Sequence, residues 1–294
     1  MDRQLLIKRY AALGGKLVDI QPSKVIRVNT LRISEAECVQ RLSVIGVQLK
    51  KISFLKYGYE VLASPFSLGA ITECLLGYYY LQESASQLPV QVLAPQPSDL
   101  ILDMAAAPGG KTTQLAQWMG NKGVVIAMEK ANFRIEGLRV NLERCGTENV
   151  IAYNTDASKV VEWPVRFDKV LLDAPCSGNY ITDADWIAKR EPEDFSRNTA
   201  VQRQLLKAGI DVLKKDGVLV YSTCSSEPED NELVIDWALK NLPVELEPVD
   251  TIGDPGLMRY NNQELSPQIA KCRRLWPHKT NTQPFFIAKL RRTQ

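Results

Sequence analysis

Two cysteines each stand at the end of an apolar run that predicts a buried strand. Asp173 ends the first run, and Cys176 follows it directly after a proline, which ends the strand because proline cannot donate to a sheet ladder. The second run, over residues 217–223, leads directly into Cys224. Ligands of open α/β sheets bind outside the carboxyl ends of the strands, so we expect the acid and both thiols to face one pocket. Free cysteines are often plain core residues, but a matched pair beside an acid favours chemistry.

A loop rich in small residues follows a further predicted strand, over residues 99–104. Small side chains and paired glycines let the backbone approach a ligand closely, and the N-terminus of the next helix faces that ligand. The motif G-x-G-x-x-G is absent, and Ala105 stands where a Walker A loop requires glycine. This near match leaves a P-loop nucleotide hydrolase as a rival interpretation. The loop residues predicted to bind a cofactor are Ala105, Ala106, Ala107, Pro108, Gly109, Gly110 and Lys111.

Acidic residues follow the next two predicted strands. Glu129 stands where an acid hydrogen-bonds ribose hydroxyls in nucleotide-binding α/β folds, and a P-loop hydrolase has no standard use for it. Asp156 is placed to accept a hydrogen bond from an adenine amino group. Neither a pyrophosphate nor a triphosphate is indicated, so the profile predicts S-adenosylmethionine. Arg134 and Asp173 are also predicted to contact this cofactor.

From residue 99 onward, predicted strands alternate with predicted helices, which is typical of a parallel, doubly wound sheet. The strands are predicted near 99–104, 123–128, 149–153, 168–173 and 217–223, followed by a pair near 245–251 and 284–290. The intervening helices are predicted near 111–119, 132–144, 198–214 and 229–240. Residues 1–65 predict a small α+β domain, residues 66–98 a connector with helices over 70–81 and 87–93, and residues 99–294 the cofactor domain.

The composition is that of an ordinary globular protein with 294 residues and a net charge of +2. Such a small net charge means that any nucleic-acid surface depends on local clustering, and the basic residues before residue 65 fit either a phosphate-contacting face or solvated surface. No apolar run approaches the ~20 residues that span a bilayer. The six cysteines form no C-x-x-C pair, so no metal site is predicted, and free thiols indicate a cytoplasmic protein.

Several short motifs share the pattern of one family. They are residues 103–111, 173–178, 222–225 and 228–232, with further matches at 82–83 and 274–278. On these motifs the chain resembles the Nol/Nop/Sun (RsmB/NOP) family of RNA cytosine-5 methyltransferases, from about residue 65 to the end. The resemblance implies a Rossmann-like methyltransferase sheet and an RNA-recognition-like (RRM-like) N-terminal domain, as in the compact archaeal-type tRNA enzymes. The chain departs from the family pattern over residues 280–286, where Gln283-Pro284 replaces Asp-Gly.

The resemblance also implies an activity and roles for individual residues. The expected reaction is methylation of cytosine C5 in RNA. The expected substrate is tRNA, and ribosomal RNA is the alternative. Cys224 is the expected nucleophile towards cytosine C6, and Cys176 the residue that releases the product. Asp173 is expected to act at N3 of the base, and Lys111 to lie near the thiolate or the base. A monomer is expected, with a small accessory protein as a candidate partner; the alternative from another class is a non-catalytic RNA-binding factor.

The single histidine and a polar segment beyond Cys176 are two further candidates for function. His278 is the single histidine, and its place near the C-terminus favours a structural role over a catalytic one. A polar segment beyond Cys176 contains Trp186, Lys189 and Arg190. It fits either a plain surface loop or an RNA contact, and we favour the RNA contact.

Overall fold

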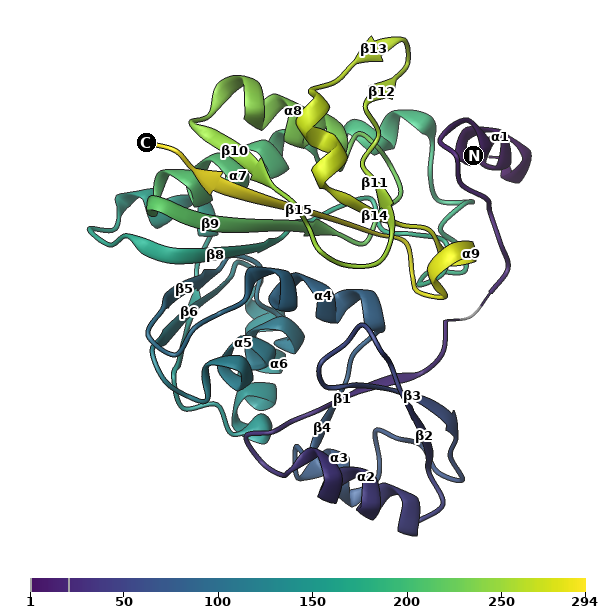
Figure 1. Ribbon diagram of the computed structural model, residues 1–294, viewed down its shortest axis with the longest axis vertical. Helices are drawn as coiled ribbons and strands as arrows, with labels where there is room; N and C mark the ends of the chain where they lie inside the picture. Colours follow the sequence, from purple (N-terminus) through teal and green to yellow (C-terminus); the bar gives the residue numbers. More distant parts are fainter. Residues whose placement is uncertain (1, 21) are drawn as a thin grey trace.

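The fold is built on a large β-sheet and a smaller one (Figure 1). This computed structural model describes residues 2–20 and 22–294. The centre of the large sheet is parallel and contains β5 (Leu100–Asp103), β6 (Val124–Glu129), β7 (Val150–Asn154), β8 (Phe167–Asp173) and β9 (Leu213–Thr223). Their order is β9-β8-β5-β6-β7, so it reverses between β5 and β8. The predicted parallel sheet is confirmed, and a ligand site is expected at the carboxyl ends of β5 and β8.

An antiparallel extension continues the large sheet beyond β9. There β15 (Phe285–Arg292) pairs with β9, with β10 (Val244–Glu247) and with β14 (Arg273–Leu275), and β14 pairs with β11 (Asp254–Pro255). The predicted C-terminal pair of strands is therefore confirmed, because β10 and β15 are hydrogen-bonded neighbours.

Helices cover both faces of the large sheet (Figure 1). On one face α4 (Ser84–Leu93) and α5 (Gly110–Met119) pack on Ile101 of β5, and α6 (Asn132–Cys145) contacts α5 and β7. On the other face α7 (Thr199–Asp211) and α8 (Glu232–Asn241) pack in the cluster that contains Leu102. Neighbouring residues of a strand point to opposite faces, so a strand covered on both faces is apolar throughout. This explains the continuous apolar runs in the sequence.

The smaller sheet is antiparallel and has the order β2-β3-β1-β4 (Figure 1). Its elements are β1 (Val25–Val28), α2 (Glu35–Val44), β2 (Gln48–Lys51), β3 (Gly58–Ala63), α3 (Thr72–Leu75) and β4 (Tyr79–Leu81). The predicted helix over 70–81 is wrong. Gly77 has a φ of +72°, which ends α3 after one turn, and a Cβ there would lie 1.9 Å from the Arg144 carbonyl oxygen. Tyr79 and Tyr80 then pair with β1, so part of the predicted connector belongs to this sheet.

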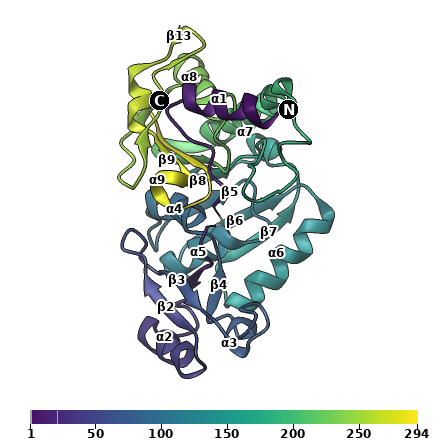
Figure 2. The same ribbon diagram turned by 90° about the vertical axis from the view of Figure 1, so that its right-hand side faces the viewer.

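The first helix, α1 (Arg3–Ala12), lies away from the smaller sheet and against the C-terminal half of the chain (Figures 1 and 2). Leu6 and Tyr10 are buried in one cluster with Trp276. Arg9 donates hydrogen bonds to Glu227 (2.6 Å) and to a second glutamate two residues later. Residues 1–65 therefore do not form one domain as predicted, because the apolar face of α1 is buried by distant residues.

Short elements complete the described fold. They are α9 (Pro277–Thr280), the hairpin of β12 (Arg259–Tyr260) and β13 (Gln263–Glu264), and the 3₁₀ turns η1 (Ala157–Glu162), η2 (Pro192–Ser196) and η3 (Pro267–Lys271). Across the described residues, no helix combines the length and the apolar character needed to cross a bilayer.

Candidate active site

The two predicted cysteines meet at the carboxyl ends of neighbouring parallel strands. Cys176 follows β8 and Cys224 follows β9, and the register pairs Asp173 with Ser222. The two loops therefore leave the sheet side by side, and the Sγ atoms lie 3.4 Å apart in hydrogen-bond contact. Both thiols are partly exposed, whereas the other cysteines in the described part of the chain are buried. This difference marks the pair as the reactive one.

The surroundings make the two thiols unequal. A hydrogen bond to Cys224, together with burial, raises the pKa of Cys176 well above its ordinary value. The same hydrogen bond lowers the pKa of Cys224, and the Lys111 ammonium adds to this while the Asp173 carboxylate opposes it. A thiolate is favoured by a donor and a nearby cation. Cys224 is therefore the thiol that ionises more easily.

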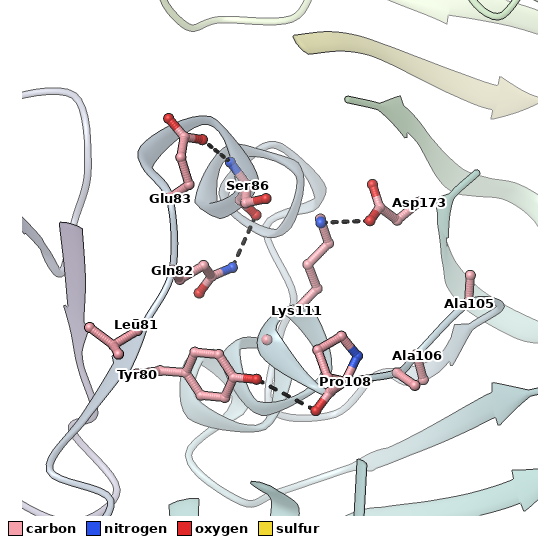
Figure 3. A pocket seen from close by; sticks show the side chains of 12 residues that line it. Tyr80, Leu81, Gln82, Glu83, Ser86, Ala105, Ala106, Pro108, Lys111 and Asp173 are labelled. Atoms are coloured by element: carbon pink, nitrogen blue, oxygen red, sulfur yellow. Dashed lines mark hydrogen bonds and ion pairs between the residues drawn. The ribbon is translucent and has the colours of Figure 1, made fainter. Parts of the chain in front are cut away.

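Asp173, the last residue of β8, is held from two sides. Lys111 Nζ lies 2.7 Å from its Oδ2 (Figure 3), and Ser222 Oγ donates a hydrogen bond of 2.7 Å to its Oδ1. About a third of its side chain stays accessible to solvent. The predicted acid and lysine thus lie together beside the cysteines, and the carboxylate has room for a further partner.

A pocket of about 610 Å³ opens over these strand ends, within the ~300–1,000 Å³ typical of small-molecule sites. The predicted cofactor residues on its wall are Ala105, Ala107, Glu129, Arg134, Asp156 and Asp173, and both cysteines line it as well. We call it the larger pocket. The pocket lies across the carboxyl ends of β5, β6 and β8, so it suits a ligand that extends from the end of β6 to the two thiols.

Glu129 is the buried acid of the larger pocket. Its Oε1 accepts a hydrogen bond from the Ala131 amide (2.8 Å), and Arg134 Nη1 lies 3.4 Å from its Oε2. The Arg134 side chain also donates to the Ala107 carbonyl oxygen. Arg134 therefore connects the cofactor loop to the acid, and the Glu129 side chain lies on the wall of the larger pocket.

Asp156 lies on the same wall, just past β7. Its Oδ1 accepts hydrogen bonds from the Ser158 amide (3.0 Å) and hydroxyl (2.8 Å), and Lys130 lies 2.8 Å from its Oδ2. The Lys130 hydrogen bond is the main reason that the pKa of Asp156 falls to about 2. Because Lys130 is largely exposed, a ligand can displace it from the carboxylate at little cost.

Asp103 supports the cofactor loop, although we did not predict it as a site residue. It is 1% exposed, and its Oδ2 accepts a hydrogen bond from the Thr112 hydroxyl (2.7 Å). Burial raises its pKa to about 6. The loop turns at Gly109, whose φ of +104° favours glycine. The sequence signal was an acid at a strand end with a threonine nine residues later.

The predicted cofactor loop faces two pockets. Ala106, Pro108, Gly110 and Lys111 line a second pocket of about 200 Å³ between the loop, β4 and α4 (Figure 3). We call it the smaller pocket; Ala105, Ala107 and Asp173 line both pockets. Gly109 lines neither pocket. The cofactor residues predicted as one set are therefore divided, and Lys111 lies on the side away from Glu129.

Arg27 of β1 is a further residue that sequence reasoning missed. It is fully buried, and its guanidinium donates hydrogen bonds to the Gly110 carbonyl oxygen, to Gln82 Oε1 (both 2.5 Å) and to Thr113 Oγ1 (2.8 Å). The smaller sheet thus holds the first turn of α5, which carries Lys111. No sequence signal distinguishes Arg27 from the exposed basic residues around it.

The segment beyond Cys176 buries its tryptophan, while several of its other side chains stay exposed. Trp186 is 2% exposed, and its indole donates a hydrogen bond of 2.7 Å to the Ser177 carbonyl oxygen, which also accepts one from Arg190 (2.9 Å). The predicted RNA contact of Trp186 is therefore wrong, since burying the indole supports the cysteine loop. Lys189 is exposed, and its RNA contact stays a prediction. His278 lies on α9 and lines neither pocket.

The residues present fit S-adenosylmethionine. Alanines line the wall of the larger pocket beside the turn at Gly109, where larger side chains would fill the space. The buried Glu129 side chain stands at the end of β6. No cluster of three or more His, Cys, Asp or Glu side chains suited to a metal ion occurs within residues 2–20 and 22–294.

Comparisons with known proteins agree with this site. Residues 90–291 match the model of a family described as 16S rRNA methyltransferase RsmB/F. The chain is 40% identical over 278 residues to the 25S rRNA (cytosine-C(5))-methyltransferase nop2 of Schizosaccharomyces pombe, covering 91% of this chain and 46% of that protein. It is 36% identical to the ribosomal RNA small subunit methyltransferase F of Klebsiella pneumoniae, covering 91% and 57%. The chain thus spans about half the length of these curated relatives.

Solved structures of similar length are also close. A methyltransferase homolog from Pyrococcus horikoshii has a TM-score of 0.86 and 43% identity, covering 93% of this chain and 88% of that one. NSun6 from Pyrococcus horikoshii, solved with the S-adenosylmethionine analogue SFG, has a TM-score of 0.83 and 28% identity, covering 93% and 92%. The chain belongs to the Nol/Nop/Sun family of RNA cytosine-5 methyltransferases, whose methyl donor is S-adenosylmethionine.

Proposed function

We propose that this chain methylates C5 of cytosine in RNA through a covalent adduct between Cys224 and C6 of the base. The observation that carries the proposal is the pair of thiols 3.4 Å apart beside the Lys111–Asp173 contact. C5 of cytosine is a poor nucleophile. When a thiolate adds to C6, the C5=C6 electron pair becomes available for attack on a methyl group, so covalent catalysis divides one hard step into easier ones.

The unequal thiols support the division of roles. Cys224 has the lowered pKa and the nearby lysine, so it forms the S–C6 bond. Asp173, as the acid, donates a proton or a hydrogen bond to N3 of the base, because N3 accepts the electron density of the adduct. After methyl transfer, the Cys176 sulfur takes the proton from C5, the electron pair of the broken C5–H bond forms the C5=C6 double bond again, and the C6–S bond breaks to release the Cys224 thiolate. Cys176 lies in contact with Cys224 and is therefore assigned to this release.

S-adenosylmethionine supplies the electrophilic methyl group. Glu129 would accept hydrogen bonds from its ribose, and Asp156 would accept one from its adenine amino group. The alanines of the cofactor loop allow close approach of its backbone. Asp173 borders both pockets, which supports a role between the cofactor and the base.

We propose tRNA as the substrate, with ribosomal RNA as the second candidate. The smaller sheet supports RNA binding, because its β-α-β-β-α-β element order with strands β2-β3-β1-β4 is that of an RRM-like domain. The motifs that resemble the compact archaeal-type tRNA enzymes of the family support tRNA. Ribosomal RNA is favoured by the names of the curated relatives, which are longer proteins.

The cysteine roles are tested with Cys224→Ala and Cys176→Ala. The first removes the attacker, so activity is lost and no adduct forms. The second permits attack and methyl transfer but blocks release, so RNA accumulates on the protein and survives a denaturing gel. Cys38→Ala, at a buried cysteine of α2, is the matched control and should retain activity. A trapped adduct in the Cys224 variant would reverse the roles, and activity in both site variants would refute the mechanism.

The substrate is tested by bisulfite sequencing of total RNA from a deletion strain. Loss of a methylated cytosine from tRNA alone supports the proposal. Loss from ribosomal RNA alone selects the second candidate, and purified protein should then methylate a fragment that contains that position.

A further inference from the structure

The segment 228–232, singled out in the sequence as one of the family motifs, has no role in the mechanism above. Its central residues, Asp230 and Asn231, are fully buried directly behind the cysteine loops. A buried carboxylate without a charged partner is costly, so its hydrogen bonds must compensate. These bonds go to the residues that flank the two catalytic thiols.

Asp230 holds the loop of Cys176. Its Oδ2 accepts hydrogen bonds from the Ser177 amide (3.0 Å) and hydroxyl (2.5 Å), so both polar groups of the residue after the thiol are fixed. Its Oδ1 accepts one from Gln202 Nε2 (2.7 Å), which also donates to the Pro175 carbonyl oxygen directly before the thiol (2.8 Å). The backbone on both sides of Cys176 is therefore tied to one carboxylate.

Asn231 holds the loop of Cys224 in the same way. Its Oδ1 accepts a hydrogen bond from the Thr223 hydroxyl (2.5 Å), and its Nδ2 donates one to the Ser225 carbonyl oxygen (2.9 Å). These are the residues directly before and after the thiol. The next residue in sequence after Asp230 thus fixes the second cysteine.

The pair Asp230–Asn231 is itself anchored. Tyr221 in β9 donates its hydroxyl to the Asp230 carbonyl oxygen (2.6 Å), and the neighbouring Glu232 forms an ion pair of 2.5 Å with Arg274, in which both side chains are buried. The two loops also touch each other, because the Ser177 and Ser225 hydroxyls lie 3.1 Å apart. The geometry around the sulfurs is thus set from one rigid point.

We infer that Asp230 and Asn231 are positioning residues that set the distance between the two catalytic sulfurs, each by fixing the loop that carries one cysteine. The inference rests on the proposed roles of Cys176 and Cys224, because a releasing thiol must lie within contact of the attacker. Neither residue lines the larger or the smaller pocket; each acts through the residues that flank one cysteine.

The distance is measured without activity by a trivalent arsenical, phenylarsine oxide. It condenses with two adjacent thiols, so that two As–S bonds form, the As–O bond is broken and the two thiol protons leave in water. The wild-type protein should bind one equivalent tightly, and Cys176→Ser and Cys224→Ser should each abolish this binding. Absence of tight binding to the wild-type protein would overturn the geometry on which the inference stands.

Asp230→Ala and Asn231→Ala should each weaken arsenical binding at least about tenfold and lower kcat by about 10–100-fold, because misplacement by about 1 Å has such effects. The affinity for S-adenosylmethionine should stay unchanged, since neither residue lines the larger pocket. Asp236→Ala is the matched control. This buried carboxylate of α8 likewise accepts a hydrogen bond from a backbone amide, that of Ser266, and it pairs with Lys240, but it has no contact to a cysteine loop.

Milder variants guard against simple unfolding. Thr223→Val removes only the hydroxyl that Asn231 binds, and Asp230→Asn keeps one oxygen for Ser177. Both should fall between the wild-type protein and the alanine variants in arsenical affinity and kcat. If Asp230 and Asn231 variants lose stability like Asp236→Ala but keep wild-type arsenical binding and kcat, the inference is wrong.

The proposed function can fail separately from this inference. If Cys176→Ala traps no RNA while arsenical binding still depends on Asp230 and Asn231, the assigned cysteine roles are wrong and the control of the sulfur distance is upheld.

Discussion

Arg27→Met tests how strongly the smaller sheet supports Lys111, which is predicted to act in catalysis. Methionine fills most of the buried volume but removes the guanidinium, which reaches the Gly110 carbonyl oxygen, Gln82 and Thr113. Gly110 is the first residue of α5 and directly precedes Lys111. The substitution therefore removes the side chain that donates hydrogen bonds to the first turn of α5.

The magnitude follows from two opposing effects. Hydrogen bonds from a charged donor contribute about 1.5–3 kcal/mol each, and three are lost. Against this, the buried cation is unfavourable: burial lowers the pKa of Arg27 to about 10, which corresponds to about 3 kcal/mol that the variant regains. We expect a net loss of about 2–5 kcal/mol in the free energy of unfolding.

Denaturant unfolding monitored by circular dichroism measures this loss, with kcat as the second readout. Arg32→Met is the matched control, because Arg32 donates to the Glu143 and Arg144 carbonyl oxygens from an exposed position. The control should change stability by less than about 0.5–1 kcal/mol and leave kcat unaltered. Wild-type stability and kcat in the Arg27 variant would refute the idea that β1 supports the active site.

Three further predictions concern the cofactor loop and the thiols. Glu129→Ala should weaken S-adenosylmethionine binding by about 1–3 kcal/mol, and an unchanged affinity by calorimetry would remove Glu129 from the cofactor site. Burial raises the pKa of Asp103 to about 6, above its unfolded value near ~4, so the stability that its neutral form contributes is complete below about pH 4 and is lost as the pH rises through about 6. Asp103→Asn should flatten that part of the stability profile, and equal pH slopes in both proteins would contradict this. Cys224 should react with iodoacetamide before Cys176, and Lys111→Met should slow that reaction; equal rates of the two thiols by peptide mass spectrometry would show that the pair is not unequal.

The parallel sheet was predictable because its signals are local. Each central strand is a continuous apolar run, and each following helix begins after a turn, so periodicity alone placed β5 to β9 within a few residues. The helix predicted over 70–81 failed for a related reason. Tyrosines suit both a helix and a strand, and only the pairing of β4 with β1 decides between them.

The site was predictable where one chemical demand falls on one strand end. Cys176, Cys224, Asp173 and Lys111 do lie together, since parallel strands bring their carboxyl ends to one edge. Trp186 was misread because an aromatic residue in a polar segment suits an RNA surface as well as a buried support. Its hydrogen bond to Ser177 depends on how the segment folds back, which no local pattern records.

Sequence by itself determined the strands and the thiols, acid and lysine that meet at one edge of the sheet, because these follow from residue types and short spacings. Only the tertiary structure decided what holds them in place. Arg9 meets Glu227 from 218 positions away in sequence, and Arg27 reaches Gly110 across 83. Buried charged and polar groups take whichever partners the packed chain brings near, so their contacts are properties of the whole fold and not of any segment.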